Sequence, residues 1–314
     1  MNRRASSDSI AQPVCVTCDA AQLRVRARRR FTLSGFAMPV GSRVPRNIPA
    51  ARNILAARNI AQLRAVAASG ALLAFDFDGT LAPKGTDPMG ARMRDETLEL
   101  LTSLAHAAPV AVITGRSVAD ATPRLPGVPL LAVIGNHGAE PSPFARRAAR
   151  EVAEWLPQLR DQVALLSGAE VEDKGQSVCV HYWTATDPDR VIAAIETLLP
   201  RLPRKVTLMH GIGLINLVPH GAPNKGDAML RLVSTHRLPG ALFVGDELTD
   251  ESAFRAALAP HSLGVRVGRS SASAASTCIA TQLDIDALLT ELLIGSTRPK
   301  RAPEPGVSAE PSQQ

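Results

Sequence analysis

Short apolar runs, each ending in a Gly-rich or polar turn, recur along the chain. Their length and bounding residues are typical of parallel strands that helices cover on both faces. The runs lie at residues 71–75, 109–114, 130–134 and 241–244, with a weaker one at 263–267. Apolar positions at helical spacing predict helices at residues 54–68, with Asn53 as N-cap, and at residues 95–107. The pattern predicts an α/β fold with a doubly wound parallel sheet.

The pattern changes between residues 141 and 219. A predicted helix at 145–166 precedes an alternating run at 177–183, and a predicted helix at 188–199 precedes a hairpin that turns at His210 and Gly211. We expect an α+β cap domain at 141–219, inserted into a catalytic core of residues 51–140 and 220–295. Residues 1–50 are predicted to form a disordered basic leader, and residues 296–314 a disordered tail.

Charge is distributed unevenly along the chain. The net charge is +6, yet residues 1–69 contain twelve Arg, no Lys and two acids, Asp8 and Asp19, which gives +10 there and −4 for the remainder. The predicted catalytic body therefore gives no reason to expect a nucleic-acid partner. The leader fits a targeting segment, a nucleic-acid arm or an upstream-start artefact equally well.

Cysteine content and hydropathy indicate the compartment. Cys15 and Cys18 have the spacing of a metal or redox pair, but no second pair of ligands follows, so we interpret the four cysteines as reduced thiols. The sequence contains no apolar run of about 18 residues and no secretory signal. These features predict a soluble, cytoplasmic protein without a membrane partner.

The run at 71–75 leads into Asp76-Phe77-Asp78-Gly79-Thr80-Leu81. Because side chains alternate along a strand, Asp76 and Asp78 are predicted on one side and Phe77 in the core. Two carboxylates at the end of a buried strand are costly unless a cation lies between them or one is protonated. The pair therefore predicts a chemical site.

Three further segments add polar groups at predicted strand or helix ends. The hydroxyl of Thr114, beside a glycine, suits a phosphoryl oxygen. Lys225 falls in the first turn of a predicted helix, where a cation is unfavourable unless an anion binds there. Four acids within residues 246–251 would repel one another without a divalent cation, and oxygen ligands favour Mg²⁺. We expect Asp246 as a direct ligand and Asp250 as a direct or water-mediated one.

In their order along the chain these segments resemble the motifs of the haloacid dehalogenase superfamily of phosphatases: D-x-D-G-T, T-G-R, N-K-G and G-D-E-x-T-D. The resemblance implies that Asp76 is a nucleophile forming an aspartyl-phosphate and that Asp78 is the general acid and base. It also implies that Thr114 and Lys225 bind the phosphoryl group. We expect the metal at Asp76, Asp78, Asp246 and Asp250.

Two segments resemble trehalose-6-phosphate phosphatases in particular. Residues 135–140 are similar to that family's G-x-H-G-x-E, and residues 171–182 contain V-E-D-K-G-x-S followed by H-Y. The resemblance implies that the disaccharide is bound by His137, Glu140, Glu172 and Lys174, and we expect Arg116, Asn136 and Asn216 at the same substrate site. The chain departs from the family pattern at Trp183, Asn216, Val218 and Glu247. Glu247 keeps its charge, whereas the other three change the predicted sugar contacts.

The sequence thus predicts a monomeric, Mg²⁺-dependent phosphatase that hydrolyses trehalose 6-phosphate, a small-molecule sugar phosphate, in trehalose biosynthesis. Another sugar phosphate, such as sucrose phosphate, mannosyl-3-phosphoglycerate or a monosaccharide phosphate, is one alternative. A non-catalytic phosphosugar sensor is the other. Such a sensor would be expected to have lost Asp76, Asp78 or Asp246, and all three are present.

Overall fold

The computed structural model describes residues 52–85, 90–211, 213–257 and 261–297, all within one compact unit, Asn47–Gln314. The predicted leader, with Cys15 and Cys18, and almost all of the predicted tail lie outside the described residues. Among the described helices, none combines the length and apolar character needed to cross a bilayer.

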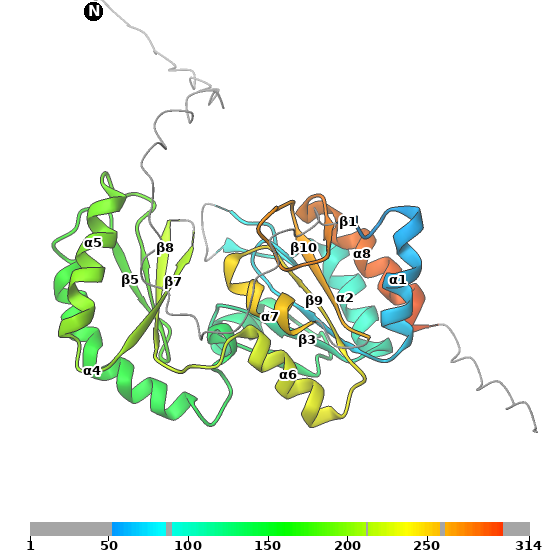
Figure 1. Cartoon of the computed structure of the whole chain (residues 1–314), viewed down its shortest axis with the longest axis horizontal. Coiled ribbons are helices and arrows are strands. Elements are labelled where there is room, and N and C mark those ends of the chain that lie inside the picture. The colour runs from blue at the N-terminus through cyan, green and yellow to red at the C-terminus, as the bar shows by residue number, and fades with distance from the viewer. Residues whose placement is uncertain (1–51, 86–89, 212, 258–260, 298–314) are drawn as a thin grey trace, which may run out of the picture. The chain divides into compact units, whose positions relative to one another are not determined.

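A parallel sheet of seven strands forms the core, in the order β1-β11-β10-β9-β2-β3-β4 (Figure 1). The strands are β1 (Arg52–Asn53), β2 (Leu72–Phe75), β3 (Val110–Ile113), β4 (Ala132–Ile134), β9 (Ala241–Gly245), β10 (Leu263–Val267) and β11 (Thr277–Ile279). Central strand β2 pairs with β9 and β3. Because all pairs are parallel, the carboxyl ends of these three strands meet at one edge of the sheet. The five predicted core strands are confirmed.

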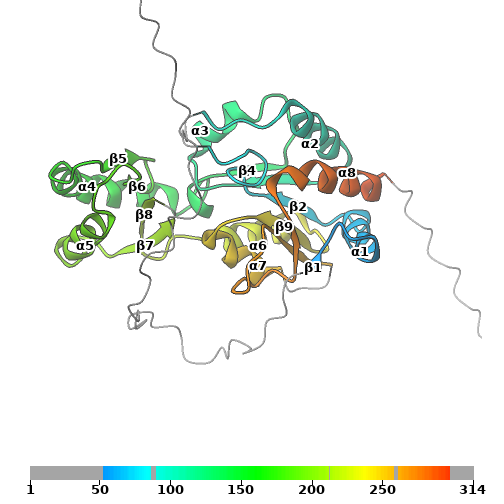
Figure 2. The same cartoon turned by 90° about the horizontal axis from the view of Figure 1, so that it is seen from above.

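Helices cover both faces of this sheet (Figure 2). Leu73 and Phe75 of β2 belong to the hydrophobic cluster of α1 (Ala57–Ala68), α2 (Asp95–Ala107) and α8 (Ile285–Ser296). Leu72 and Ala74 belong to the cluster of α6 (Lys225–His236) and α7 (Glu251–Ala256) on the other face. Every residue of β2 is buried, as expected for a central strand of a doubly wound sheet. The predicted fold class is confirmed.

A separate antiparallel sheet of four strands follows the order β5-β6-β8-β7. Its elements are α4 (Ala145–Val163), β5 (Glu170–Asp173), β6 (Val178–His181), α5 (Pro188–Leu198), β7 (Val206–Gly211) and β8 (Leu214–Pro219). One face packs on α4 and α5 through residues such as Trp155, Val180 and Ile215. Since side chains alternate, Glu172, Cys179 and Asn216 lie on the other face, which we call the inner face. This sheet fits the predicted cap, whose boundaries remain a prediction.

The remaining described elements are short connections. They are α3 (Val118–Ala121) and the 3₁₀ turns η2 (Thr122–Arg124), η3 (Asn136–Gly138), η4 (Leu199–Arg201), η5 (Leu248–Asp250) and η6 (Gln282–Asp284).

Two local predictions are wrong. Asn53 does not cap a helix: it lies in β1, its side chain accepts a hydrogen bond from the amide of Leu55 at 2.9 Å, and α1 begins only at Ala57. The cap hairpin does not turn at His210 and Gly211, since both still belong to β7. Strand β5 was not predicted, because three of its four residues are acidic and only its pairing with β6 makes it a strand.

Candidate active site

Three polar residues follow directly on the central strands of the core sheet. Asp76 follows β2, Thr114 follows β3 and Asp246 follows β9. Because these strand ends share one edge of the sheet, side chains that are distant in sequence lie together. This edge is the candidate site.

The carboxylates of Asp76, Asp246 and Asp250 form a compact group, with one oxygen of each within 4.8 Å of the others. Atom Oδ1 of Asp246 is buried and has no hydrogen-bond partner in the described part of the chain. Its Oδ2 atom accepts from the ammonium of Lys84 at 2.6 Å. An unpartnered carboxylate oxygen beside two further carboxylates fits a hard divalent cation such as Mg²⁺. The structure thus brings together three of the four predicted metal ligands.

Gly79 leaves room for this group. Its φ of +79° is left-handed, and a Cβ atom there would lie 2.5 Å from Oδ2 of Asp246. A side chain at this position would therefore strain the backbone and displace the carboxylate. The glycine of the D-x-D-G-T segment is required by both constraints.

Lys225 is the buried cation of the site. It is the first residue of α6, and its Nζ atom lies 2.6 Å from Oδ1 of Asp250 and 2.9 Å from Oδ1 of Asp76. Burial disfavours the ammonium, but the charges of Asp250 and Asp76 outweigh burial and raise the pKa of Lys225 above its usual value. The ammonium therefore stays protonated, and the protein's own carboxylates offset its position in the first turn of the helix.

The acids of the site have too little positive charge around them. Burial raises the pKa of Asp76 well above its usual range; Lys225 opposes this rise, while Asp250 and Asp246 add to it. Burial likewise raises the pKa of Asp246 to about 6, against the opposing charge of Lys84. A divalent cation between these carboxylates would remove the deficit.

Asp78 is held apart from the acidic group by Arg116. Atoms Nε and Nη2 of Arg116 donate to the two oxygens of Asp78 at 2.7 and 2.6 Å, and Nη1 donates to Asp120 at 2.6 Å. The guanidinium lies 5.6 Å from the ring centre of Phe77, which is buried as predicted. A bidentate pair of this kind fixes the carboxylate geometry. Of the four predicted metal ligands, Asp78 is the one whose side chain is paired with Arg116 instead. Arg116, which we expected at the substrate, contacts Asp78 and Asp120.

Thr114 and His137 lie side by side at the end of β3. The hydroxyl of Thr114 accepts from the amide of Arg116 at 3.2 Å, and its carbonyl accepts from the amide of His137 at 2.9 Å. Neither ring nitrogen of His137 meets the geometry of a hydrogen bond with a described residue, although the side chain of Asn216 is close enough to raise its pKa. Burial, together with the charges of Lys225 and Lys174, lowers the pKa of His137 well below its usual range. The neutral imidazole therefore has one donor and one acceptor to offer a ligand.

Asn136 joins the core to the inserted sheet. Its Oδ1 atom accepts from the hydroxyl of Ser177 at 2.6 Å, and its amide nitrogen donates to Glu140 at 2.8 Å and to the carbonyl of Lys174 at 3.3 Å. Glu140 also accepts from the amide of Val118 at 3.0 Å. Asn136 and Glu140, which we expected at the substrate, are thus bonded to protein groups. The role of Ser177 was not predicted.

Lys174 begins a row of side chains on the inner face. Its Nζ atom donates to the carbonyl of Gly115 at 3.4 Å and to Oδ1 of Asn216 at 3.3 Å, and it lies 3.7 Å from Oε2 of Glu172. Gly115 directly follows Thr114. The predicted sugar-binding residues Glu172, Lys174 and Asn216 are therefore together, beside the end of β3.

The row continues through His181, which belongs to the H-Y segment of the family pattern but was given no role from the sequence. Its Nε2 atom lies 2.8 Å from Oε2 of Glu172, and its ring stacks on Trp183 at 5.5 Å between centroids. Contacts with Cys179 and Glu172 raise the pKa of His181 to about 9 against the effect of burial. Glu172, Cys179 and His181 could also group around a metal ion.

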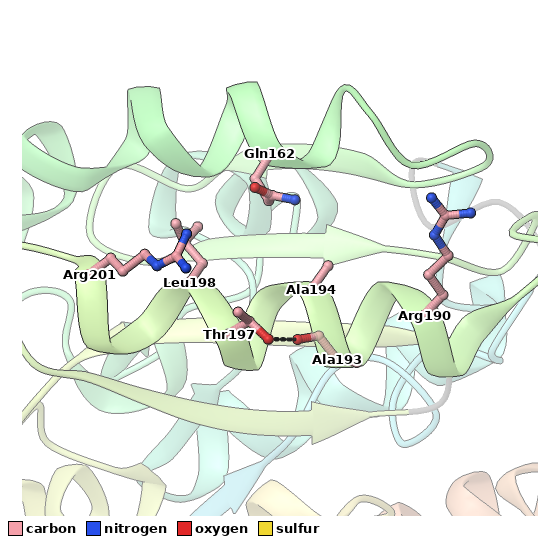
Figure 3. A pocket seen from close by; sticks show the side chains of 7 residues that line it. All are labelled: Gln162, Arg190, Ala193, Ala194, Thr197, Leu198 and Arg201. Atoms are coloured by element: carbon pink, nitrogen blue, oxygen red, sulfur yellow. Dashed lines mark hydrogen bonds between the residues drawn. The ribbon is translucent and has the colours of Figure 1, made fainter.

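A surface pocket lies between α4 and α5, on the other side of the inserted sheet (Figure 3). Its lining residues are Gln162, Arg190, Ala193, Ala194, Thr197, Leu198 and Arg201. The one hydrogen bond drawn among them joins the hydroxyl of Thr197 to the carbonyl of Ala193 within α5. The pocket brings no acid, thiol or imidazole together, so the strand ends of the core remain the candidate site.

Comparison with solved structures agrees with this fold. The C-terminal domain of trehalose-6-phosphate phosphatase from C. albicans superposes with a TM-score of 0.61 at 20% identity, over 79% of this chain and 99% of that chain. A trehalose-6-phosphate phosphatase related protein gives a TM-score of 0.58 at 25% identity, over 71% of this chain and 97% of that one. The chain has a haloacid dehalogenase-like fold.

Sequence comparison identifies the family. The family model for trehalose-phosphatase matches residues 74–284, so the chain belongs to the trehalose-phosphatase family. Over 234 residues the chain is 32% identical to the trehalose-phosphate phosphatase of Mycobacterium tuberculosis, which covers 69% of this chain and 59% of that protein. The chain therefore spans less than two thirds of the length of this curated relative.

Proposed function

We propose that the protein is a Mg²⁺-dependent phosphatase that hydrolyses trehalose 6-phosphate to trehalose and phosphate through an aspartyl-phosphate at Asp76. The observation that supports this most is the environment of Asp76. Asp76 is 3% exposed, and its carboxylate lies 2.9 Å from the ammonium of Lys225 and belongs to the acidic group with Asp246 and Asp250. A nucleophile, a cation and candidate metal ligands thus meet at one point in a chain of the trehalose-phosphatase family.

Asp76, Asp246 and Asp250 would hold the metal, because one oxygen of each lies within 4.8 Å of the others and Oδ1 of Asp246 has no hydrogen-bond partner among the described residues. A bound Mg²⁺ supplies positive charge that stabilises the phosphoryl oxygens and reduces their repulsion of the attacking carboxylate.

Asp76 attacks the phosphorus atom, so that an oxygen–phosphorus bond forms while the bond to the sugar oxygen breaks. Lys225 and Thr114 bind the phosphoryl oxygens as charge redistributes. Asp78, which carries a proton when the substrate is bound, gives it to the leaving sugar oxygen and later takes one from the water that hydrolyses the aspartyl-phosphate. One of the two hydrogen bonds that Asp78 accepts from Arg116 must therefore open during turnover. Arg116 orients Asp78 through its two hydrogen bonds to that carboxylate.

The sugar would be bound mainly by the row on the inner face. Glu172, Lys174 and Asn216 offer charged and polar groups, and His137 offers a neutral donor and acceptor beside Lys174. Asn136 and Glu140 act on the substrate indirectly in this proposal, since both are bonded to protein groups. The monomeric state, the cytoplasmic location and the lack of a nucleic-acid or membrane partner remain predictions.

Phosphate release from a panel of sugar phosphates tests the proposal. Trehalose 6-phosphate, sucrose 6-phosphate, mannosyl-3-phosphoglycerate and glucose 6-phosphate are compared with Mg²⁺ and with EDTA. We expect the fastest release from trehalose 6-phosphate, dependence on Mg²⁺, and a loss of about 10³-fold or more in Asp76→Asn. Release from trehalose 6-phosphate no faster than from glucose 6-phosphate would remove the substrate assignment. Binding without release by the wild-type protein would favour the sensor.

A further inference from the structure

Trp183 is a large aromatic side chain left exposed at the end of the row on the inner face. It is 49% exposed, whereas Trp155, the second of the two tryptophans in the chain, is completely buried. Aromatic side chains contribute the most when their apolar surface is covered. An exposed indole beside a group of polar residues therefore points to a ligand that covers it.

The indole is held in one orientation by the residues around it. Its ring stacks on His181 at an interplanar angle of 17°, and the His181 ring is in turn 2.8 Å from Glu172. Beneath the indole lies Gly213, where a Cβ atom would be 2.6 Å from Cε3 of Trp183. A fixed ring costs little conformational entropy when a ligand binds.

A short series of contacts connects this ring to the proposed phosphoryl site. The ammonium of Lys174 lies 3.4 Å from the carbonyl of Gly115 and 3.7 Å from the carboxylate of Glu172. The same carboxylate lies 2.8 Å from Nε2 of His181, and the ring centre of His181 lies 5.5 Å from that of Trp183. A hexose attached to a phosphate at Asp76 would lie beside Lys174 and Glu172. A second ring would extend along the row toward Trp183.

We infer that Trp183 is a specificity-determining residue that stacks on the distal, unphosphorylated ring of a disaccharide phosphate. The inference rests on the proposed function and adds to it the group that distinguishes two sugar rings from one. Pyranose rings have apolar C–H faces that pack on the negative face of an aromatic ring, while their hydroxyls take hydrogen bonds from charged neighbours. Glu172, Lys174 and His181 provide such neighbours along the same row.

Tryptophan emission gives a direct test. The non-hydrolysing Asp76→Asn protein is titrated with trehalose 6-phosphate and with glucose 6-phosphate. We expect the disaccharide to change the emission more than the monosaccharide does, and the change to disappear when Trp183→Phe leaves Trp155 as the only tryptophan. No change at saturating trehalose 6-phosphate would overturn the inference.

Kinetics of three substitutions separate stacking from simple filling of space. The ratio of kcat/KM for trehalose 6-phosphate to that for glucose 6-phosphate is measured. We expect it to fall about tenfold in Trp183→Ala and Trp183→Leu, mainly through KM, and to stay within about threefold in Trp183→Phe. Leu165→Ala, which removes a side chain of the inserted segment that is 75% exposed, is the matched control. A ratio retained in Trp183→Leu would show that bulk alone matters and would overturn the inference.

Failure of the proposed function would be recognised separately. If the wild-type protein releases no phosphate from trehalose 6-phosphate, the substrate assignment is wrong, and the emission titration is repeated with trehalose. A change that Trp183→Phe abolishes would still support sugar stacking, and an unchanged emission would overturn it.

Discussion

The candidate site has a phosphoryl end, around Asp76, and a sugar end, along the row on the inner face. The two ends differ in burial and therefore in how much a substitution costs the stability of the fold. At the phosphoryl end, Lys225 and Asp250 are 1% and 0% exposed and satisfy each other's charge. At the sugar end, Asn216 and His137 are each 4% exposed, but farther along the row the Glu172 side chain is 43% exposed and Trp183 is 49% exposed. Removing a buried charge leaves its partner uncompensated, whereas an exposed side chain can be replaced at little cost to the fold. Residues that carry out the phosphoryl chemistry are therefore also needed for stability of the fold. The exposed residues that select the sugar are not.

The largest effect is expected from Lys225, the buried one of two lysines that contact the acids. In Lys225→Met, kcat should fall about 10³-fold, and the free energy of unfolding should fall by about 3 kcal/mol, because buried carboxylates lose their cation. Lys84→Met is the matched control, since the Lys84 side chain is 40% exposed while contacting Asp246 and Glu247. It should cost less than about tenfold in kcat. Phosphate release and urea unfolding measure both; equal losses would show that burial does not distinguish the two lysines.

Asp246→Asn should separate stability from activity. Burial raises the pKa of Asp246 from 3.8 to about 6, so the folded state favours the protonated carboxyl and loses that advantage as pH rises through 6. Without Mg²⁺ at pH 7.5, the neutral amide should therefore raise Tm by about 3 °C, and this gain should vanish below about pH 4.

The same substitution should abolish both the rise in Tm on adding Mg²⁺ and the hydrolysis of the substrate, because the amide is a poor ligand for the ion. Thermal unfolding at several pH values, with Mg²⁺ and with EDTA, measures these effects. A lower Tm for Asp246→Asn than for the wild-type protein in EDTA at pH 7.5 would contradict the account of charge deficit at the phosphoryl end.

A smaller effect is expected where the two ends join. Ser177→Ala removes the hydroxyl that donates to Asn136 at 2.6 Å, and leaves a buried amide oxygen unsatisfied. The free energy of unfolding should fall by about 1–3 kcal/mol. Thr197→Ala removes an exposed hydroxyl that bonds the carbonyl of Ala193 and should change stability by less than about 0.5 kcal/mol. Urea unfolding compares the two variants. An equal change in both would show that the Ser177–Asn136 hydrogen bond between the core and the inserted sheet contributes no more to stability than an exposed hydroxyl does.

The sequence predicted the phosphoryl end far better than the sugar end. Asp76, Thr114 and Asp246 each follow an apolar run, and the rule that parallel strands end at one edge was enough to bring them together. Periodicity, together with the resemblance to the superfamily motifs, therefore located most of the candidate site before any side-chain contact was known.

Side-chain pairing could not be predicted in this way. The bond of Arg116 to Asp78 and that of Ser177 to Asn136 join segments 38 and 41 residues apart. Such contacts depend on where connecting loops return and on the rotamers chosen there, and neither leaves a periodic signal. Strand β5 is similar, since its acidic residues have low strand propensity and only pairing with β6 orders them.

The smallest effect concerns the Glu172–His181 pair at the sugar end. In Glu172→Gln the imidazolium loses a charged partner, so the pKa of His181 should fall by about one unit from its value of about 9. A raised histidine pKa stabilises the folded state fully below pH 6.5, and this stabilisation is lost between 6.5 and about 9. The variant should therefore be less stable than the wild-type protein at pH 6, by under about 1 kcal/mol because Glu172 is partly exposed. The difference should shrink at pH 10, where Glu172→Gln still loses the contact with Lys174 at 3.7 Å. Glu170→Gln is the control: Glu170 lies opposite His181 in the strand register, yet Cys179 and Glu172 are the residues that raise the pKa of that histidine. NMR titration of the histidine ring protons measures the pKa of His181. An equal fall of this pKa in Glu170→Gln would mean that any nearby acid on the strand, rather than the contact with Glu172, keeps His181 charged next to Trp183.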